Sequence, residues 1–156
     1  MKHYFYIETP LSFLTAGEEN DLLTELLWGK IPMEGICQET PLLKLTEKEI
    51  QAYFRRELTR FSIPYLLRGT DFQKEVWTAL AQVPYGKTIS YQELARKSGH
   101  PDACRAVGTA CSKNPINLII PCHRIVNKNG KPGNYRGGNE RKKHLIAHES
   151  NKMSFF

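Results

Sequence analysis

The organisation of this 156-residue chain follows from one stretch, Asn114-Pro115-Ile116-Asn117-Leu118-Ile119-Ile120-Pro121-Cys122-His123-Arg124-Ile125-Val126. Its apolar run 118–121 has the length and composition of a short buried strand. Proline has no amide hydrogen to donate to a sheet, so we expect Pro121 to end that strand. Cys122 and His123 would then follow where the chain leaves the sheet, on rigid structure near the surface, which suits a nucleophile.

A cysteine beside a histidine also has a purely structural interpretation. Free cysteine commonly packs as a small buried apolar side chain. A thiol is also a weak nucleophile at neutral pH until its pKa falls or a base removes its proton. The dipeptide therefore leaves both interpretations open.

Composition limits the class of protein. The length allows one or two compact domains, and 40% of the residues are hydrophobic, which is enough for a core. No apolar run has the length of a membrane span, and the first residues lack the pattern of a secretory signal. The four cysteines show no disulfide spacing, so we expect reduced thiols and a cytoplasmic location, nucleoid-associated or nuclear according to the organism.

The cysteines also give little support for a metal. A zinc site from Cys104, Cys111, Cys122 and His123 is conceivable, but the spacings match no standard zinc finger or ribbon. We therefore expect no metal and no cofactor.

Basic residues are concentrated in the second half of the chain. The net charge is +6, with eight Lys/Arg against ten Asp/Glu in residues 1–68 and fourteen against six in residues 69–156. This asymmetry favours a polyanion as partner of the second half. Basic residues that only solvate a surface would give the same counts, so charge alone does not decide.

The first half predicts a small sheet. Aromatic and β-branched residues at 3–7 predict a strand, and the apolar residues 11–15 favour a second one. Turn-forming residues occupy 17–20. The leucine spacing in 21–28 favours a helix, with a hairpin strand as the alternative.

A helix and a linker are expected next. Thr46 and Glu49 have the spacing of a capping box, and the apolar residues after them recur on one face, which predicts an amphipathic helix over 47–60. The segment 61–68 contains Pro64 and is expected to link two domains.

The second half predicts a helix-turn-helix arrangement. Capping boxes begin at Thr70 and Ser90, each with a glutamine or glutamate three residues later. The second box opens a short helix to about Ser98, and Pro101 suits the first position of a further helix to about Ser112. Two helices joined by a turn in a basic half are typical of a DNA-binding unit.

The helix predicted at 101–112 has a surface of small residues, with Arg105 as its one long charged side chain. Such a surface often packs against a neighbouring helix. In a basic helix-turn-helix unit it would instead permit close approach to DNA, where one arginine could enter the base stack. The small residues are Ala103, Ala106, Gly108, Thr109 and Ala110.

The segment after the cysteine is rich in turns and glycine. Residues 127–130 predict a turn, and three glycines within 133–138 would let backbone approach a ligand closely, although a surface loop has the same composition. Asn139 is expected to cap a final helix over 140–149, followed by a frayed tail at 150–156.

Taken together, these residues resemble the O6-alkylguanine-DNA alkyltransferases, also called methylated-DNA--protein-cysteine methyltransferases. The resemblance runs continuously over 69–149, whereas the first half matches weakly, mainly at 9–11. The motifs, in the family's order, are Gly-Thr-Asp-Phe-Gln-Lys-Glu-Val-Trp (69–77), Pro-Tyr-Gly-Lys-Thr-Ile-Ser-Tyr (84–91), Arg-Ala-Val-Gly (105–108), Asn-Pro (114–115), Pro-Cys-His-Arg (121–124), Gly-Asn-Tyr (133–135), Gly-Gly (137–138) and Ala-His-Glu (147–149).

The resemblance implies an α+β fold. A small N-terminal sheet-plus-helix domain, ribonuclease-H-like, is expected over 1–68. A mostly helical winged helix-turn-helix domain that binds DNA and accepts the alkyl group is expected over 69–156. The resemblance also makes 21–28 a hairpin strand, against its leucine spacing. We expect a monomer that acts on double-stranded DNA containing O6-alkylguanine, without a cofactor.

The resemblance further implies irreversible, single-turnover transfer of the alkyl group from O6-alkylguanine to the protein, with O4-alkylthymine as a further candidate substrate. Cys122 corresponds to the acceptor, whose sulfur attacks the alkyl carbon and displaces the guanine oxygen. His123 and Glu149 correspond to the pair that removes the thiol proton through a water. Asn114 corresponds to the asparagine that holds the active-site turn, and Tyr91 to the acid that protonates ring nitrogen 3 of the leaving guanine.

The target base has to leave the duplex to reach the cysteine. By resemblance, Arg105 fills the gap in the base stack, amides near Arg136 contact the departing oxygen, and carbonyls near Cys122 and Ile125 contact the exocyclic amine. The candidate DNA-binding residues are Arg105, Tyr91, Gln92, Ala106, Gly108 and Lys128. The candidate pocket residues are Ile125, Tyr135, Arg136 and Gly137.

The chain departs from the family pattern at a few positions. Asn117 stands where many relatives carry proline or a small residue beside the pocket, and Arg136 where a small residue such as serine is frequent. Both bear on the range of alkyl groups, and Arg136 could narrow the pocket or contact a phosphate. Asn139 replaces a usual leucine, and Lys128 lies in the loop after the active-site turn. The zinc ligands of some family N-terminal domains have no evident counterpart.

Three other functions fit parts of the pattern. A non-enzymatic protein that binds alkylguanine and flags the damage would share the fold but lack Cys122. A transcription factor would need base-reading polar side chains, which the 101–112 helix does not show. A cysteine hydrolase would form an acyl intermediate in place of a thioether.

Overall fold

The computed structural model describes residues 1–131 and 133–150. The frayed tail expected at 150–156 lies outside these ranges except for Ser150, which caps the last helix. Within the described ranges, every helix is too short or too polar to cross a membrane.

The described residues form two compact units. Unit 1 comprises residues 1–67 together with 115–117, and unit 2 comprises 68–114 and 118–150. The short segment 115–117 therefore belongs to unit 1, although the chain on both sides of it belongs to unit 2.

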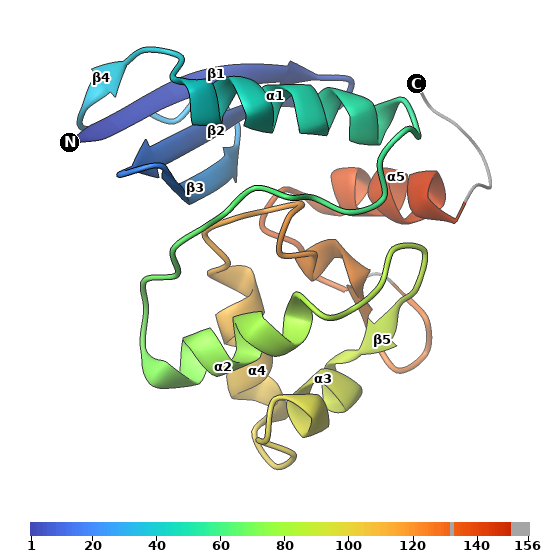
Figure 1. The fold of residues 1–156 in the computed structure, drawn as a ribbon. Coiled ribbons are helices and arrows are strands. Elements are labelled where there is room, and N and C mark those ends of the chain that lie inside the picture. The colour runs from blue at the N-terminus through green and yellow to red at the C-terminus, as the bar shows by residue number, and fades with distance from the viewer. Residues whose placement is uncertain (132, 151–156) are drawn as a thin grey trace. The chain divides into compact units, whose positions relative to one another are not determined.

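Unit 1 is a four-stranded sheet covered by one helix (Figure 1). The strands β1 (Lys2–Thr9), β2 (Ser12–Glu19), β3 (Leu22–Trp28) and β4 (Ile36–Cys37) precede the helix α1 (Pro41–Phe54). The order in the sheet is β3-β2-β1-β4, with β1–β2 and β2–β3 antiparallel and β1–β4 parallel. Sheet and helix share a core of apolar side chains: Ile7, Leu14, Ala16, Leu23, Leu26, Leu43, Ile50 and Tyr53.

The strand predictions hold in part. The strand at 3–7 is confirmed, and the strand favoured at 11–15 is the first part of β2. The hairpin strand at 21–28 that the family resemblance implied is also confirmed, whereas the helix favoured by its leucine spacing was wrong. The turn predicted at 17–20 was also wrong, because β2 continues through Glu19 and the chain reverses at Asn20 and Asp21, with φ of 52° and 62°. Glu18 tolerates its buried position in β2 because the Thr40 hydroxyl donates to its carboxylate at 2.7 Å.

The helix of unit 1 begins earlier than predicted. Thr40 is the N-cap, accepting from the Leu43 amide, and Pro41 occupies the first turn, where its missing amide hydrogen has no cost. Thr46, the predicted cap, is buried inside the helix and its hydroxyl donates to the Leu42 carbonyl at 2.8 Å. The helix therefore spans 41–54, and the predicted range 47–60 was wrong.

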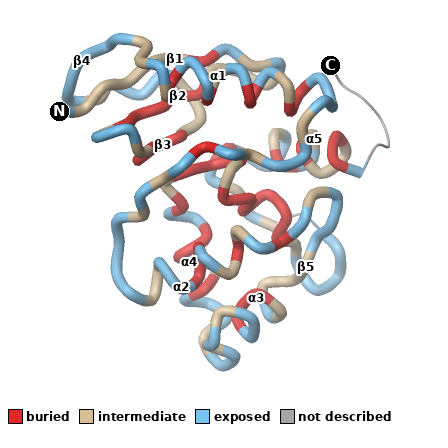
Figure 2. Tube along the Cα trace, in the orientation of Figure 1, coloured by how far each residue is buried: buried red, intermediate tan, exposed pale blue. Residues whose placement is uncertain are grey.

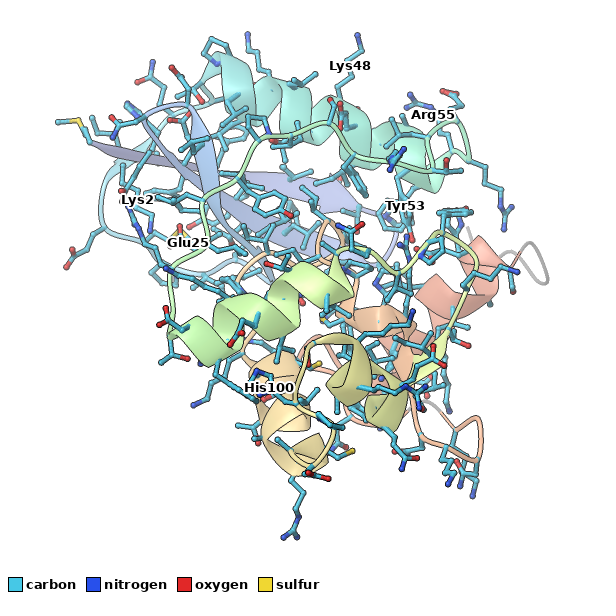
Figure 3. All side chains as sticks on the ribbon, turned by 60° about the horizontal axis from the view of Figure 1, so that its bottom comes forward. Lys2, Glu25, Lys48, Tyr53, Arg55 and His100 are labelled. Atoms are coloured by element: carbon cyan, nitrogen blue, oxygen red, sulfur yellow. The ribbon has the colours of Figure 1, made fainter. Side chains whose placement is uncertain are left out.

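Two segments outside the named strands pair with β3. The Leu23 amide donates to the Pro64 carbonyl at 2.9 Å, and the Leu26 amide donates to the Pro115 carbonyl at 2.8 Å. Asn117 donates to the Leu26 carbonyl from its backbone amide at 2.8 Å and from its side-chain amide at 3.1 Å. At the surface of the sheet, Lys2 and Glu25 form an ion pair of 2.7 Å (Figure 3).

Unit 2 is mostly helical (Figure 1). It contains the helices α2 (Asp71–Leu80), α3 (Tyr91–Lys97), α4 (Cys104–Ser112) and α5 (Asn139–Glu149), with the short 3-10 helix η1 (Cys122–Arg124). Two short parallel strands, β5 (Ile89–Ser90) and β6 (Ile125–Val126), pair between the helices. With the sheet of unit 1, this confirms the predicted α+β class.

The helices of unit 2 pack through one buried face each (Figure 2). Trp77 of α2 is 2% exposed, and its indole nitrogen donates to the Ala110 carbonyl of α4 at 2.9 Å. The other apolar core side chains include Val76, Leu80, Leu94, Val107, Ile120, Ile125 and Leu145.

Helix starts in unit 2 agree with the sequence where a side-chain cap is present. Thr70 and Gln73 form the predicted capping box, and Ser90 accepts from the Glu93 amide. Two predicted starts were wrong. The fourth helix begins at Cys104, because Pro101 lies in a turn, and Asn139 is the first residue of α5, preceded by Gly138 with φ of 97°.

The strand predicted at 118–121 was wrong. Residues 117–120 form a turn in which Leu118 has a positive φ of 70°, a conformation that interrupts a strand. The run is apolar because Leu118 and Ile120 are buried in the core, not because they belong to a sheet. Cys122 then begins η1, at the end of a buried turn.

The capping box at Thr70 gives a first test of these interactions. Replacing Thr70 with alanine removes the acceptor for the Gln73 amide, so the free energy of unfolding should fall by about 1 kcal/mol. Thr78→Ala is the matched control, because Thr78 is exposed in the middle of the same helix. Urea unfolding followed by tryptophan fluorescence measures both. Equal stability of the two variants would contradict a stabilising cap.

Candidate active site

Cys122 is held by a buried asparagine. Asn114, at the end of α4, is fully buried, and its side-chain amide donates to the Ile120 carbonyl at 2.7 Å and to the Cys122 sulfur at 3.2 Å. The Cys122 amide also donates to the Ile120 carbonyl at 2.8 Å. The side-chain amide of Asn114 thus fixes the turn that presents the thiol and at the same time stabilises negative charge on the sulfur.

A buried carboxylate lies behind the cysteine. Glu149, the last residue of α5, accepts from Nε2 of His123 at 2.7 Å. Arg124 donates to both carboxylate oxygens, from Nε at 2.7 Å and from Nη2 at 3.0 Å. Its remaining nitrogen, Nη1, donates to the Val83 carbonyl at 2.7 Å. The carboxylate is therefore held by two neighbouring residues of η1 at once.

These contacts determine which nitrogen of His123 carries hydrogen. Burial alone raises the pKa of Glu149, but the adjacent His123 and Arg124 outweigh burial and hold that pKa well below its ordinary value. An ionised carboxylate only accepts hydrogen bonds, so Nε2 of His123 must be the donor. In the neutral ring Nδ1 is then an acceptor, and Nδ1 is buried with no hydrogen-bond partner among the described residues.

The Cys122 thiol is protonated at neutral pH. Burial raises its pKa to about 11, although the hydrogen bond from Asn114 and the positive charges of Lys142 and Arg136 oppose that rise. Thiolate, not thiol, is the nucleophile. If Cys122 acts as a nucleophile, a base therefore has to take the proton of its thiol.

Cys122 lines a pocket of about 470 Å³ in unit 2. The pocket contains Tyr91, Arg105, Gly108, Tyr135 and Arg136, all candidates from the sequence. The other lining residues were not among these candidates, although Thr109 belongs to the predicted surface of small residues, and Gly133 and Asn134 to the glycine-rich segment expected to approach a ligand. They are Thr109, Cys111, Ser112, Asn127, Gly133 and Asn134. The lining residues on α4 recur at the spacing of one helix face. That face includes part of the surface of small residues predicted from the sequence.

Several candidates lie elsewhere. Ile125 and Gly137 are buried and do not line the pocket. Gln92, Ala106 and Lys128 are exposed, also outside the lining, on α3, on α4 and in the turn at 127–130.

Tyr91 is the first residue of α3, and its side chain contacts the glycine-rich segment. Its hydroxyl donates to the Asn134 carbonyl at 3.2 Å. Gly133 has a φ of 71°, a conformation that favours glycine, and a Cβ atom there would make a tight contact of 3.3 Å with the Tyr91 ring. Burial and the neighbouring thiols raise the pKa of Tyr91 to about 12, so the phenol keeps its proton.

Lys142 is a site residue that the sequence did not reveal. It is fully buried, its ammonium donates to the Asn134 carbonyl at 3.1 Å, and it lies 5.7 Å from the centre of the Tyr91 ring. Burial lowers its pKa to about 8. In a helix as polar as α5, a lysine predicts a solvent-exposed face, so only the tertiary contacts identify it.

The structure supports neither the zinc site considered from the cysteine spacing nor a position of Asn117 beside the pocket. In the part of the chain that the structure describes, no cluster of histidine, cysteine or acidic residues could hold a metal ion. All four cysteines are free thiols. Asn117 does not line the pocket, and both of its amide groups donate to Leu26 in unit 1.

The chain matches known proteins over nearly its whole length. Residues 71–151 match the family model described as 6-O-methylguanine DNA methyltransferase, DNA binding domain. The methylated-DNA--protein-cysteine methyltransferase of Mycobacterium bovis is 41% identical, over 97% of this chain and 94% of that protein. The constitutive enzyme of that name from Bacillus subtilis is 38% identical, over 88% of each chain. The crystal structure of Mycobacterium tuberculosis OGT in complex with DNA superposes with a TM-score of 0.91 at 39% identity, over 98% of this chain and 96% of that one.

A free cysteine backed by a histidine and a glutamate, in a unit that matches a DNA-binding domain, defines the class as DNA-repair enzymes that work by alkyl transfer. Within that class, the chain belongs to the methylated-DNA--protein-cysteine methyltransferase family. The family resemblance seen in the sequence is thereby confirmed.

The buried carboxylate predicts a pH-dependent contribution to stability. Glu149→Gln leaves the Arg124 guanidinium buried without its counter-charge, so the free energy of unfolding should fall by about 3 kcal/mol at neutral pH. Because the pKa of Glu149 is lower in the folded state, its contribution is present above the ordinary carboxyl pKa and is lost as pH falls through the folded value.

Urea unfolding of both proteins between about pH 7 and about pH 3 measures this contribution. The difference between wild type and Glu149→Gln should shrink on acidification. A difference that stays constant over this range would contradict an ionised, paired Glu149.

Proposed function

We propose that this protein repairs O6-alkylguanine in double-stranded DNA by moving the alkyl group to its own Cys122. The observation that carries the proposal is the geometry of one site: a thiol lining an open pocket, directly followed by a histidine whose far nitrogen is bound to a buried carboxylate. A binding protein that only flags damage has no use for this arrangement.

Proton removal falls to His123. Its Nδ1 faces no hydrogen-bond donor among the described residues and is an acceptor, so it can take the Cys122 proton through one bridging water. Glu149 orients the ring and stabilises the imidazolium that results, as the third member of a triad does. Asn114 and Lys142 favour the thiolate once it forms.

The transfer is an in-line substitution. The Cys122 thiolate attacks the alkyl carbon, and the bond from that carbon to guanine O6 breaks. Tyr91 donates a proton to ring nitrogen 3, which makes guanine a better leaving group. Its phenol is suited to this role because it stays protonated and lines the same pocket as the thiol.

The guanine is oriented by backbone around the pocket. We assign the amide of Arg136 to the departing oxygen, and the carbonyls of Cys122 and Ile125 to the exocyclic amine. Tyr135 and Gly137 stand on either side of Arg136 and set the course of that backbone. O4-alkylthymine presents a similar oxygen and is a further candidate substrate.

The base reaches the thiol by rotating out of the duplex. Arg105 is exposed on α4 and also lines the pocket, and both observations support our assignment of Arg105 to the gap in the base stack. The small residues Ala106 and Gly108 let α4, as the second helix of a winged helix-turn-helix, approach the minor groove closely. Exposed Gln92 and Lys128 then contact the backbone without reading sequence.

The product is a thioether on Cys122. A thioether is not opened by a neighbouring thiol, so Cys111 in the pocket does not regenerate the acceptor. We infer one turnover for each protein molecule.

The test is the mass of the intact protein after mixing with a duplex that carries one O6-methylguanine, followed by peptide mapping. Wild type should gain one methyl group, on Cys122, without further turnover. Cys122→Ser should bind the duplex and gain nothing, whereas Cys104→Ser should react as wild type, because Cys104 is exposed and does not line the pocket. Binding by wild type without mass gain would favour a protein that only flags damage.

Base rotation gives a separate prediction for Arg105. Arg105→Ala should slow methyl transfer from duplex DNA by about tenfold or more, because refilling the stack recovers part of a cost of a few kcal/mol. Transfer from free O6-alkylguanine, which has no stack, should change little. Arg96→Ala removes the same charge from an exposed position on α3 and is the control. Equal losses on duplex and free base would contradict the role in base rotation.

A further inference from the structure

The charged side chains that line the Cys122 pocket are all positive. Among its described lining residues are two arginines, Arg105 and Arg136, and no aspartate or glutamate. Lys142 adds a buried positive charge that acts on the Cys122 sulfur. Acidic residues of unit 2 are used elsewhere: Glu149, for example, is bound behind the cysteine by His123 and Arg124.

Arg136 is placed differently from Arg124 and Arg141. The Arg124 guanidinium is taken up by Glu149, and Arg141 donates to the Gly137 carbonyl at 2.7 Å. Arg136 is exposed at the corner of a turn that is closed by a hydrogen bond from the Gly138 amide to the Tyr135 carbonyl at 2.9 Å. Arg136 lines the pocket, and its side chain makes no hydrogen bond or ion pair with any described residue.

Arg136 also lies within electrostatic reach of the reacting atom. Its positive charge lowers the pKa of the Cys122 thiol, against the larger effect of burial. During transfer the alkyl carbon touches that sulfur, so substituents on the carbon occupy the surrounding pocket. A guanidinium there is suited to a carboxylate, which it can bind through two parallel hydrogen bonds.

We propose that Arg136 makes this pocket selective for alkyl groups that carry a negative charge, with the carboxymethyl group of O6-carboxymethylguanine as the simplest substrate. The inference rests on the proposed function and adds the substrate class of the same site. Arg105 is assigned to the base stack, which leaves Arg136 as the pocket arginine available to the alkyl group.

The reaction is the same substitution with a different group. The Cys122 thiolate forms a bond to the methylene carbon, and the bond between that carbon and guanine O6 breaks. The electron pair stays on the guanine, which takes up a proton, and the thiol proton has passed to His123. The product is S-carboxymethylcysteine, whose carboxylate remains beside Arg136.

A phosphate of the DNA is the competing partner for Arg136. Binding of a phosphate and binding of the alkyl group by Arg136 would depend differently on salt and on the charge of the alkyl group. A phosphate contact strengthens binding of every duplex alike and weakens with salt, whereas a contact with the alkyl group acts only on charged groups. Three duplexes that differ only at guanine O6 separate them: one with carboxymethyl, one with its neutral isostere carbamoylmethyl, and one with methyl.

The experiment measures single-turnover transfer to Cys122 from each duplex by mass spectrometry, for wild type, Arg136→Ser and Arg136→Lys. In wild type the carboxymethyl group should react faster than carbamoylmethyl. In Arg136→Ser the ratio of these two rates should fall about threefold to tenfold, as expected for a partly exposed charged hydrogen bond. Arg136→Lys keeps the charge and should retain most of the ratio.

The outcomes are distinguishable. A ratio that is unchanged in Arg136→Ser would overturn the proposal, and an equal loss on all three duplexes that deepens with salt would assign Arg136 to phosphate. Failure of wild type to transfer even methyl would instead contradict the proposed function itself. Circular dichroism of Arg136→Ser confirms that the variant is folded, which is expected because the Arg136 side chain makes no hydrogen bond or ion pair with any described residue.

Discussion

The buried carboxylate of Glu149 is the interaction on which the site of unit 2 depends. A charge with 3% of its side chain exposed is tolerated only when its oxygens are bound by partners of opposite charge or by strong donors. Here both partners, His123 and Arg124, come from the turn that contains Cys122. The end of α5 and this turn are therefore fixed to each other. Replacing such an ion pair with apolar residues often stabilises a protein, so the value of this one lies in the geometry it imposes.

The Cys122 thiol, which we propose as the alkyl acceptor, is weakly nucleophilic in the free protein. Burial keeps the Cys122 thiol protonated, while the groups that favour the thiolate, Asn114 and Lys142, act without overcoming burial. For the single-use acceptor that we propose, this balance is an advantage, because a protonated thiol reacts slowly with small electrophiles in solution. Glu149 already orients the ring of His123, whose Nδ1 we propose as the proton acceptor, so the proposed activation needs a proton transfer and no rearrangement of these residues.

The sequence predicted those parts of the fold that depend on neighbouring residues. The capping box at Thr70 works locally, and the strand at 3–7 combines the residue types that favour strands. Predictions failed where contacts between residues far apart in the sequence determine the local structure. The leucines of 21–28 have helical spacing, yet they form β3 because both β2 and the segments at 64–66 and 115–117 pair with it.

The candidate site shows the same division. Cys122, His123 and Glu149 could be singled out because the family motifs contain them. Arg124 stands in one of those motifs, but its bond to Glu149, 25 residues away in sequence, appears only in the fold. Lys142 is harder still, since its helix gives no sign that a charged residue is buried there. Lys142 becomes part of the site through its contacts with Asn134 and Tyr91, and Tyr91 lies far from it in the sequence.

The two departures from the family pattern at 117 and 136 now have different meanings. Both bore on the range of alkyl groups when only the sequence was considered. Asn117 donates two hydrogen bonds to the Leu26 carbonyl of β3. Arg136 lines the pocket, and its side chain makes no hydrogen bond or ion pair with any described residue. Size alone would make Arg136 a restriction on bulky groups. Its positive charge acts on the Cys122 sulfur, and this supports our proposal that Arg136 distinguishes alkyl groups of equal size by their charge.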